Sequence, residues 1–283
     1  MLNALIPLSA LLISNAFLIL GHGLLLTLLP IAASGAGFSD TQVALTGSGY
    51  FLGFVSGCLA TPLMLKRVGH IRSFAVLATC YSVVILVFPL LPEFYSWMLL
   101  RFLIGVMISG LYMIIESWLN GTSTATNRGT ILSIYTTLNL LMVMCGQQLF
   151  NLGSERESML FGLAAIFISI AIIPVSLTRS SAPAVVKQVK LNMPKVWQHS
   201  HVALIGAVVA GFVTGAFWAL APIYAKDNGF DSIQLGAFLS ATVLGGACFQ
   251  VPLGKLSDRF DRRSVFCFLQ RFSLDLQLNQ TAV

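Results

Sequence analysis

Eight stretches of this chain are each about as long as a membrane-spanning helix and carry almost no charged side chain. An α-helix needs about 20 apolar residues to cross the hydrocarbon core of a bilayer. Inside lipid every backbone N–H and C=O group must bond within the protein, which a helix achieves by itself. We therefore expect eight spanning helices, at residues 5–33, 42–65, 73–92, 94–119, 129–152, 158–178, 202–225 and 232–253.

The amino-acid composition supports a multi-pass membrane protein. Hydrophobic residues make up 57% of the chain and charged residues 9%, whereas soluble domains carry about 25% charged residues. The net charge of +6 comes from loops between apolar runs, so it indicates no nucleic-acid partner. The five cysteines show no paired spacing, and nucleotide-binding, zinc and nucleophile-elbow motifs are absent from the sequence. We expect no metal, no cofactor and no enzymatic activity, with the lipid bilayer as the main partner.

The distribution of Lys and Arg predicts which side of the membrane each loop faces. With the N-terminus in the cytoplasm, twelve basic residues lie in cytoplasmic loops and only Arg156 and Lys226 lie in external loops. The twelve are Lys66, Arg67, Arg72, Arg128, Arg179, Lys187, Lys190, Lys195, Lys255, Arg259, Arg262 and Arg263. Cytoplasmic loops are generally the ones enriched in Lys and Arg. We therefore expect a cytoplasmic N-terminus and a cytoplasmic linker at residues 179–201.

The first two expected spans recur at a fixed offset of 192 residues, as from Gly37 to Gly229. The matched positions are Pro30-Ile31 with Pro222-Ile223, Gly37-Phe38 with Gly229-Phe230, Gln42 with Gln234, Gly53 with Gly245, and Arg67 with Arg259. Spans one and two therefore recur as spans seven and eight. Parallel repeats related by an axis along the membrane normal are one way in which transporters are built.

A dense charged motif directly follows the last expected span. It reads Gly254-Lys255-Leu256-Ser257-Asp258-Arg259-Phe260-Asp261-Arg262-Arg263. The pattern resembles the loop signature of the major facilitator superfamily of transporters, which follows the second helix and again the eighth. In that family the glycine lets two helices approach closely, and the aspartate and arginines form a cytoplasmic charge lattice that latches the outward-facing state. The resemblance gives these roles to Gly254, Leu256, Asp258, Arg259, Asp261, Arg262 and Arg263.

The first copy of this loop departs from the family pattern. It keeps Arg67, Gly69 and Arg72 but has Lys66 where the motif aspartate belongs, so the usual aspartate latch cannot form there. Two further stretches extend the resemblance, namely Arg101-Phe102-Leu103-Ile104-Gly105, and residues 115–118 leading to Asn127-Arg128-Gly129. Over most of residues 25–263 the chain resembles the YcaD-type branch of the superfamily.

The resemblance implies an all-α multi-pass membrane protein with the major facilitator fold. Residues 1–178 would form a complete six-helix first bundle, and residues 202–263 the first two helices of a second bundle. The implied function is secondary transport of a small solute by alternating access, in a bacterial inner membrane, with H⁺ as a candidate coupling ion. The alternative is a non-transporting membrane remnant or sensor on the same scaffold. The oligomeric state is left open.

The tail, residues 264–283, is too polar to form a ninth span. Its longest wholly apolar run is residues 265–269, and Arg271 and Asp275 would each cost about 2.5–3.5 kcal/mol at a span centre. We therefore expect a truncated transporter, with the reading frame altered shortly after Arg263, that does not transport by itself. A genuine eight-span protein that completes itself by dimerising is the competing explanation.

A polar stripe follows one face of the fourth expected span. At 100° per residue, Arg101, Gly105, Ser109, Tyr112 and Glu116 lie on the same side of the helix. Charged side chains within a span are costly and are usually functional or paired. The resemblance matches Arg101 and Gly105 to an Arg-x-x-x-Gly signature that is associated with proton-coupled members.

Two interpretations stay open for each charged residue of this stripe. Arg101 either lines the transport cavity or snorkels outward. Glu116 either belongs to the transport site or bridges Arg67 or Arg72 on the cytoplasmic side.

Other polar residues are candidates on neighbouring spans. Asn139 and Gln147 share a face of the fifth span and would either bind a polar solute or hydrogen-bond adjacent helices. His22 would either relay protons, because the unperturbed pKa of histidine is about 6.5, or simply pack with a hydrogen-bond partner.

The predicted topology is testable with reporter fusions along the chain. A fusion at Gln188, in the expected linker, should report a cytoplasmic location, and a fusion at residues 155–157 an external one. The expectation rests on the strong excess of basic residues on one side. A periplasm-active fusion at Gln188 would overturn the topology.

Overall fold

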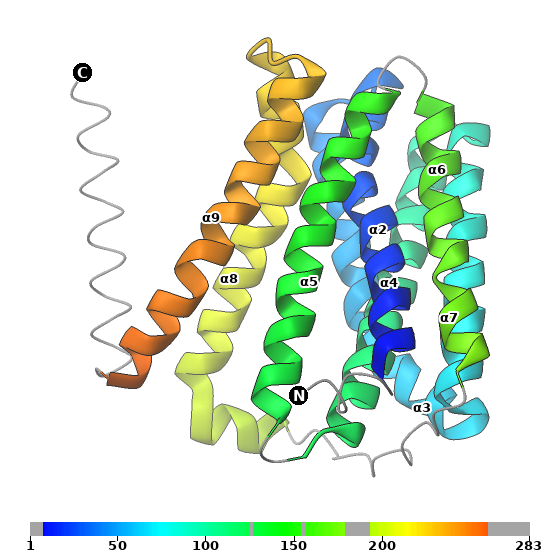
Figure 1. Cartoon of the computed structure of the whole chain (residues 1–283). Helices are drawn as coiled ribbons and strands as arrows, with labels where there is room; N and C mark the ends of the chain where they lie inside the picture. The colour runs from blue at the N-terminus through cyan, green and yellow to red at the C-terminus, as the bar shows by residue number, and fades with distance from the viewer. Residues whose placement is uncertain (1–7, 125–126, 154–156, 179–192, 260–283) are drawn as a thin grey trace. The chain divides into compact units, whose positions relative to one another are not determined.

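The computed structural model describes residues 8–124, 127–153, 157–178 and 193–259, and it divides the chain into two compact units, Met1–Ser240 and Ala241–Val283. Every regular element in the described residues is helical (Figure 1). The helices are α2 (Ser9–Gly35), α3 (Asp40–Val87), α4 (Phe94–Thr122), α5 (Arg128–Leu149), α6 (Glu157–Ile170), α7 (Ile172–Leu177), α8 (Met193–Asp227) and α9 (Ser232–Arg259). Short 3₁₀ turns, η2 (Phe88–Leu90) and η3 (Phe150–Leu152), follow α3 and α5. The all-α membrane architecture expected from the sequence is confirmed.

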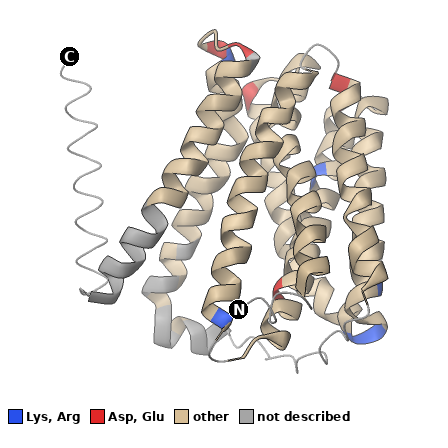
Figure 2. Ribbon diagram, in the orientation of Figure 1, with Lys and Arg blue, Asp and Glu red and all other residues tan. Residues whose placement is uncertain are grey.

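Six helices within the described residues are long and apolar enough to cross a membrane. One of them, Asp40–Leu90, has 51 residues and contains the second expected span and most of the third. The apolar segment Ile233–Cys248 of α9 is shorter. Lys, Arg, Asp and Glu lie mainly at the helix ends, as the low solubility of charge in lipid requires (Figure 2).

One boundary differs from the sequence expectation, while the sixth expected span corresponds to Glu157–Leu177, in which Ala171 between α6 and α7 keeps helical backbone angles. Helix α8 begins at Met193, inside the stretch 179–201 that we expected to be a linker. Pro194 is compatible with this early start, because proline is tolerated in the first turn of a helix, where its missing N–H is not needed. The rest of that stretch, 179–192, and the tail 264–283 lie outside the described residues.

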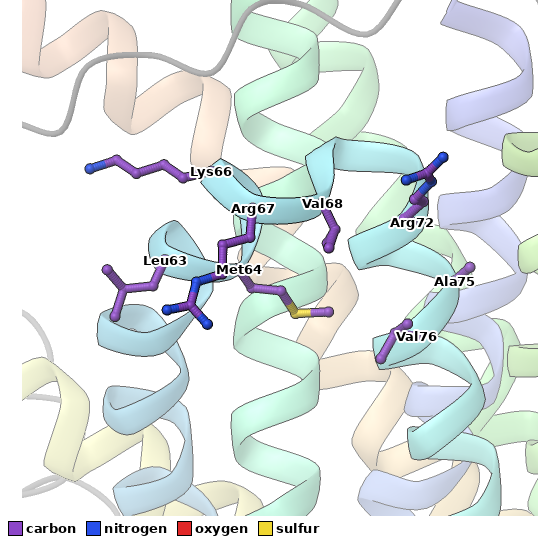
Figure 3. A pocket seen from close by; sticks show the side chains of 8 residues that line it. All are labelled: Leu63, Met64, Lys66, Arg67, Val68, Arg72, Ala75 and Val76. Atoms are coloured by element: carbon purple, nitrogen blue, oxygen red, sulfur yellow. The ribbon is translucent and has the colours of Figure 1, made fainter.

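Gly69 divides α3 into two arms, residues 40–68 and 70–87 (Figures 1 and 3). Its φ of 78° and ψ of 177° fall in a region that essentially only glycine occupies. A Cβ at this position would meet nothing within 4 Å. Gly69 is therefore required by the backbone conformation of the turn and not by close packing.

The 192-residue repeat is also a repeat of backbone geometry. Gly37 and Gly229 have φ of 86° and 80°, and each ends a helix. In both copies the next residue donates to a carbonyl five residues earlier, which is the Schellman arrangement. The two bonds are Phe38 N to Ala33 O at 3.1 Å and Phe230 N to Ala225 O at 3.0 Å.

The helices that follow these turns begin with matching caps. At the start of α3, the Gln42 backbone N–H donates to Ser39 Oγ at 3.3 Å, and Ser39 N donates to Gln42 Oε1 at 2.9 Å. At the start of α9, Gln234 N donates to Asp231 Oδ1 at 2.7 Å, and Asp231 N donates to Gln234 Oε1 at 3.0 Å. Both are reciprocal capping boxes. The repeat inferred from the sequence is therefore confirmed at the level of hydrogen bonds.

Helix α2 is the central helix of the first unit, in contact with α5, α6, α7 and α8. A Cβ at Gly21 would lie 2.8 Å from the carbonyl oxygen of Ala164 on α6, and one at Gly23 would lie 2.8 Å from that of Val143 on α5. Helices in lipid associate through small residues that let their backbones approach. These two glycines on either side of His22 therefore hold α2 between its neighbours (Figure 1).

The most extensive helix interface joins α3 to α4. A Cβ at Gly53 would clash with the carbonyl oxygen of Phe102, and one at Gly105 would clash with the carbonyl oxygen of Tyr50. Gly105 is the glycine of the Arg-x-x-x-Gly stretch. Because Gly105 packs directly against α3, the face of α4 that also carries Arg101 is turned toward α3.

Replacing Gly69 with alanine should destabilise the protein without any steric clash. The expected loss is about 1–3 kcal/mol, because the turn conformation is unfavourable for a residue with a Cβ. Thermal unfolding in detergent measures it. The matched control is Gly162→Ala in α6, where a Cβ also meets nothing within 4 Å but the helix favours alanine by up to about 1 kcal/mol. Equal effects of the two substitutions would contradict this explanation.

Candidate functional site

Arg101 is buried within α4, with only 7% of its surface exposed. Its Nε has no hydrogen-bond partner among the described residues. The side chain is within electrostatic reach of His22, Tyr50 and Tyr81. This position favours an interior role over the alternative in which Arg101 snorkels outward.

His22 on α2 connects this arginine to both arms of α3. Its Nδ1 lies 2.7 Å from the hydroxyl of Tyr81, on the second arm. Its ring stacks against that of Tyr50, on the first arm, with centroids 6.2 Å apart. Tyr112 on α4 is within electrostatic reach of both tyrosines. We call His22, Tyr50, Tyr81, Arg101 and Tyr112 the central polar cluster.

Three of these five residues were expected from the sequence, and two were missed. Tyr50 and Tyr81 belong to separate arms of α3, so helical periodicity cannot relate one to the other. The available signal was a phenol hydroxyl in the middle of an apolar run, because a buried Tyr O–H usually has a partner.

One of the two expected amides of α5, Asn139, faces α2. Asn15 Nδ2 donates to Asn139 Oδ1, which joins the two helices. Gln147 is fully buried, and neither its Nε2 nor its Oε1 has a partner among the described residues. The two expected amides thus differ: Asn139 bonds a neighbouring helix, while Gln147 keeps its hydrogen-bonding groups unused.

Glu116 does not pair with Arg67 or Arg72 in the described part of the chain. It is exposed on α4 and accepts a hydrogen bond from Tyr135 Oη of α5 at 3.4 Å. Glu116 also lies within electrostatic reach of Cys58 on α3 and of Tyr112, the member of the central polar cluster one turn before it. It is therefore connected to the cluster through Tyr112 and has no bridge to Arg67 or Arg72 among the described residues.

The first charged loop forms an open groove, described below, that includes Arg67 and Arg72 (Figure 3). In the second copy, Gly254, Leu256, Asp258 and Arg259 lie on the last turns of α9, and their side chains are outside the described residues. Asp261, Arg262 and Arg263 also lie outside them. The charge lattice implied by the family resemblance stays a prediction.

Comparison with known proteins identifies a family. The family model of the Major Facilitator Superfamily matches residues 11–269. The uncharacterised MFS-type transporter YcaD of Escherichia fergusonii is 28% identical over 259 residues, which cover 90% of this chain and 68% of that protein. YcaD of Salmonella arizonae is 26% identical over 258 residues with the same coverage.

Solved transporters share the fold. A bacterial homologue of the human lysosomal transporter Spinster, inward-facing and unoccupied, gives a TM-score of 0.66 at 16% identity, covering 91% of this chain and 63% of that one. A D-xylose–proton symporter gives 0.61 at 14% identity, covering 89% and 69%. The chain thus spans about two thirds of the length of these proteins.

The two amides of α5 should respond in opposite directions to substitution by leucine. Gln147→Leu should raise thermal stability in detergent, because a buried polar group without a partner costs about 1–3 kcal/mol. The matched control, Asn139→Leu, should lower stability by leaving Asn15 without its partner. A loss of stability in Gln147→Leu would contradict the unpaired state of this amide and assign it a structural role.

Proposed function

Because residues 11–269 match its family model, this chain belongs to the major facilitator superfamily, and we propose that it carries a small solute by alternating access. In transporters of this kind the solute site lies near the bilayer midplane, between two helical bundles. We place the site of this protein at the central polar cluster. We also propose a bacterial inner-membrane location with the N-terminus in the cytoplasm.

The observation that carries the proposal is the buried charge of Arg101. A cation inside a membrane protein is expensive, and it is retained where it acts on a substrate, an ion or a partner. Arg101 has no ion-pair partner among the described residues, and its Nε is unpaired. Its nearest ionisable neighbours are an imidazole and phenols. A site this rich in donors suits a solute that offers acceptor oxygens, such as a carboxylate or a phosphate.

His22 is the candidate for coupling solute movement to protons. It is hydrogen-bonded to Tyr81 and lies within electrostatic reach of Arg101. An anion that binds Arg101 would reduce the positive field at the imidazole and so favour its protonation. Solute and proton would then occupy the site together, as cotransport requires. Gln147 adds an unused amide on α5.

The test measures solute binding and transport with the full chain. Binding is read from the thermal shift in detergent across a panel of small carboxylates, phosphates and neutral sugars. Transport is read in proteoliposomes with an internal pH dye. We expect one acidic solute class to bind and to move protons. Arg101→Gln should weaken binding about 10–100-fold, the effect of losing a hydrogen bond to a charged group.

Two further variants make the result specific. His22→Gln should keep solute binding but abolish its dependence on pH, because the variant lacks the titrating imidazole. Arg128→Gln, a substitution of an exposed residue at the start of α5, should change neither. If no solute binds or moves, the chain is a non-transporting protein on this scaffold. Preference for a neutral solute would refute the role given to Arg101.

A further inference from the structure

An open groove lies at the turn of α3, at the end of the helices remote from the Gly37 turn. Its volume is about 790 Å³. It lies between the two arms that meet at Gly69, so the glycine conformation that reverses the helix also creates the groove (Figure 3). The lining residues are Leu63, Met64, Lys66, Arg67, Val68, Arg72, Ala75 and Val76.

The polar part of the lining is entirely cationic. Lys66, Arg67 and Arg72 are exposed, and no acidic residue lines the groove. Neither Arg67 nor Arg72 has a hydrogen-bond or ion-pair partner within the described stretches of the chain. Lys66 stands where the charged-loop pattern has an aspartate, so this turn lacks an acid of its own. Arg67 and Arg72 therefore call for a negative partner from outside the turn.

The remaining lining is apolar and open to the surroundings. Leu63 is 59% exposed, Val76 50% and Val68 40%. Figure 3 shows Leu63 and Met64 on one arm and Val76 on the other, with the cations near the turn. Apolar side chains that continue into a group of basic ones match the transition from acyl chains to headgroups at a membrane surface.

We propose that this groove binds one anionic phospholipid of the leaflet that faces the basic loops. The lipid phosphate lies at the basic turn, where Arg67 and Arg72, whose guanidinium groups point in different directions in Figure 3, rotate to donate to its oxygens. An acyl chain follows Leu63, Met64 and Val76. Basic pockets between helices on the cytoplasmic side are suited to anionic headgroups. A free phosphate would satisfy the cations but leave the apolar wall uncovered. The inference concerns a different part of the molecule from the proposed transport site and does not depend on it.

The test is a lipid titration of the delipidated full chain, followed by native mass spectrometry. The probes are phosphatidylglycerol and phosphatidylcholine with identical acyl chains. Glycerol phosphate is added as a competitor that carries the charge without the chains. We expect preferential retention of phosphatidylglycerol, and no displacement by glycerol phosphate at equal concentration.

Two variants test separately how the charges and the apolar lining of the groove contribute to lipid binding. Arg67→Gln with Arg72→Gln should weaken phosphatidylglycerol binding about 30-fold, since each basic residue near an anionic surface contributes about fivefold. Val76→Trp keeps every charge but fills the groove, and it should reduce binding of the same lipid. Val76 is half exposed, so the larger side chain does not disturb the core. Arg128→Gln removes an exposed charge elsewhere and should leave binding unchanged.

Three outcomes would overturn the proposal. Equal retention of phosphatidylglycerol and phosphatidylcholine would show that charge does not select the lipid. Unchanged binding in the double arginine variant, with thermal stability preserved, would place the lipid elsewhere. Displacement by glycerol phosphate, together with normal binding in Val76→Trp, would show that the groove is a site for a soluble phosphate.

Discussion

The contact between the backbones of α3 and α4 at Gly53 and Gly105 is the interaction on which the candidate site depends. In lipid, helices gain little from the hydrophobic effect and associate where small residues permit close packing. A Cβ at either glycine would meet a carbonyl oxygen of the opposite helix. Gly105 follows Arg101 by one helical turn, so this contact brings the arginine to the arm that carries Tyr50. If the two helices were further apart, Arg101 would no longer lie within reach of Tyr50.

The buried polar groups fall into two kinds with different consequences. The pairs His22–Tyr81 and Asn15–Asn139 form hydrogen bonds across helices and thereby help to fix which helices are neighbours, although Asn15 Oδ1 has no partner among the described residues. Arg101 Nε and both amide atoms of Gln147 have no partner in the described residues. Unsatisfied buried groups lower stability, so a protein that retains them gains something else. In the proposed function, that gain is the ability of Arg101 and Gln147 to bind a polar solute.

A single turn gives α3 two separate roles. Gly69 lets the helix reverse direction, which places Tyr50 and Tyr81 on different arms but around the same histidine. The same reversal opens the basic groove at the turn. The loop pattern drew attention to Gly69, and its open surroundings and its φ of 78° show that backbone conformation is what requires it.

The sequence alone determined the spans, the family and the repeat, because each depends on patterns among residues that are close together in the chain. Apolar length sets a span, and the pair Gly37 and Gly229 sets identical helix ends whatever lies around them. Periodicity also placed Arg101, Gly105 and Tyr112 on one face of α4. Only the tertiary structure decided which residues meet: that His22 bonds Tyr81, and that Glu116 faces Tyr135 instead of Arg67. Periodicity gives the direction of a side chain from its own helix, but the neighbour in that direction is set by packing against other helices.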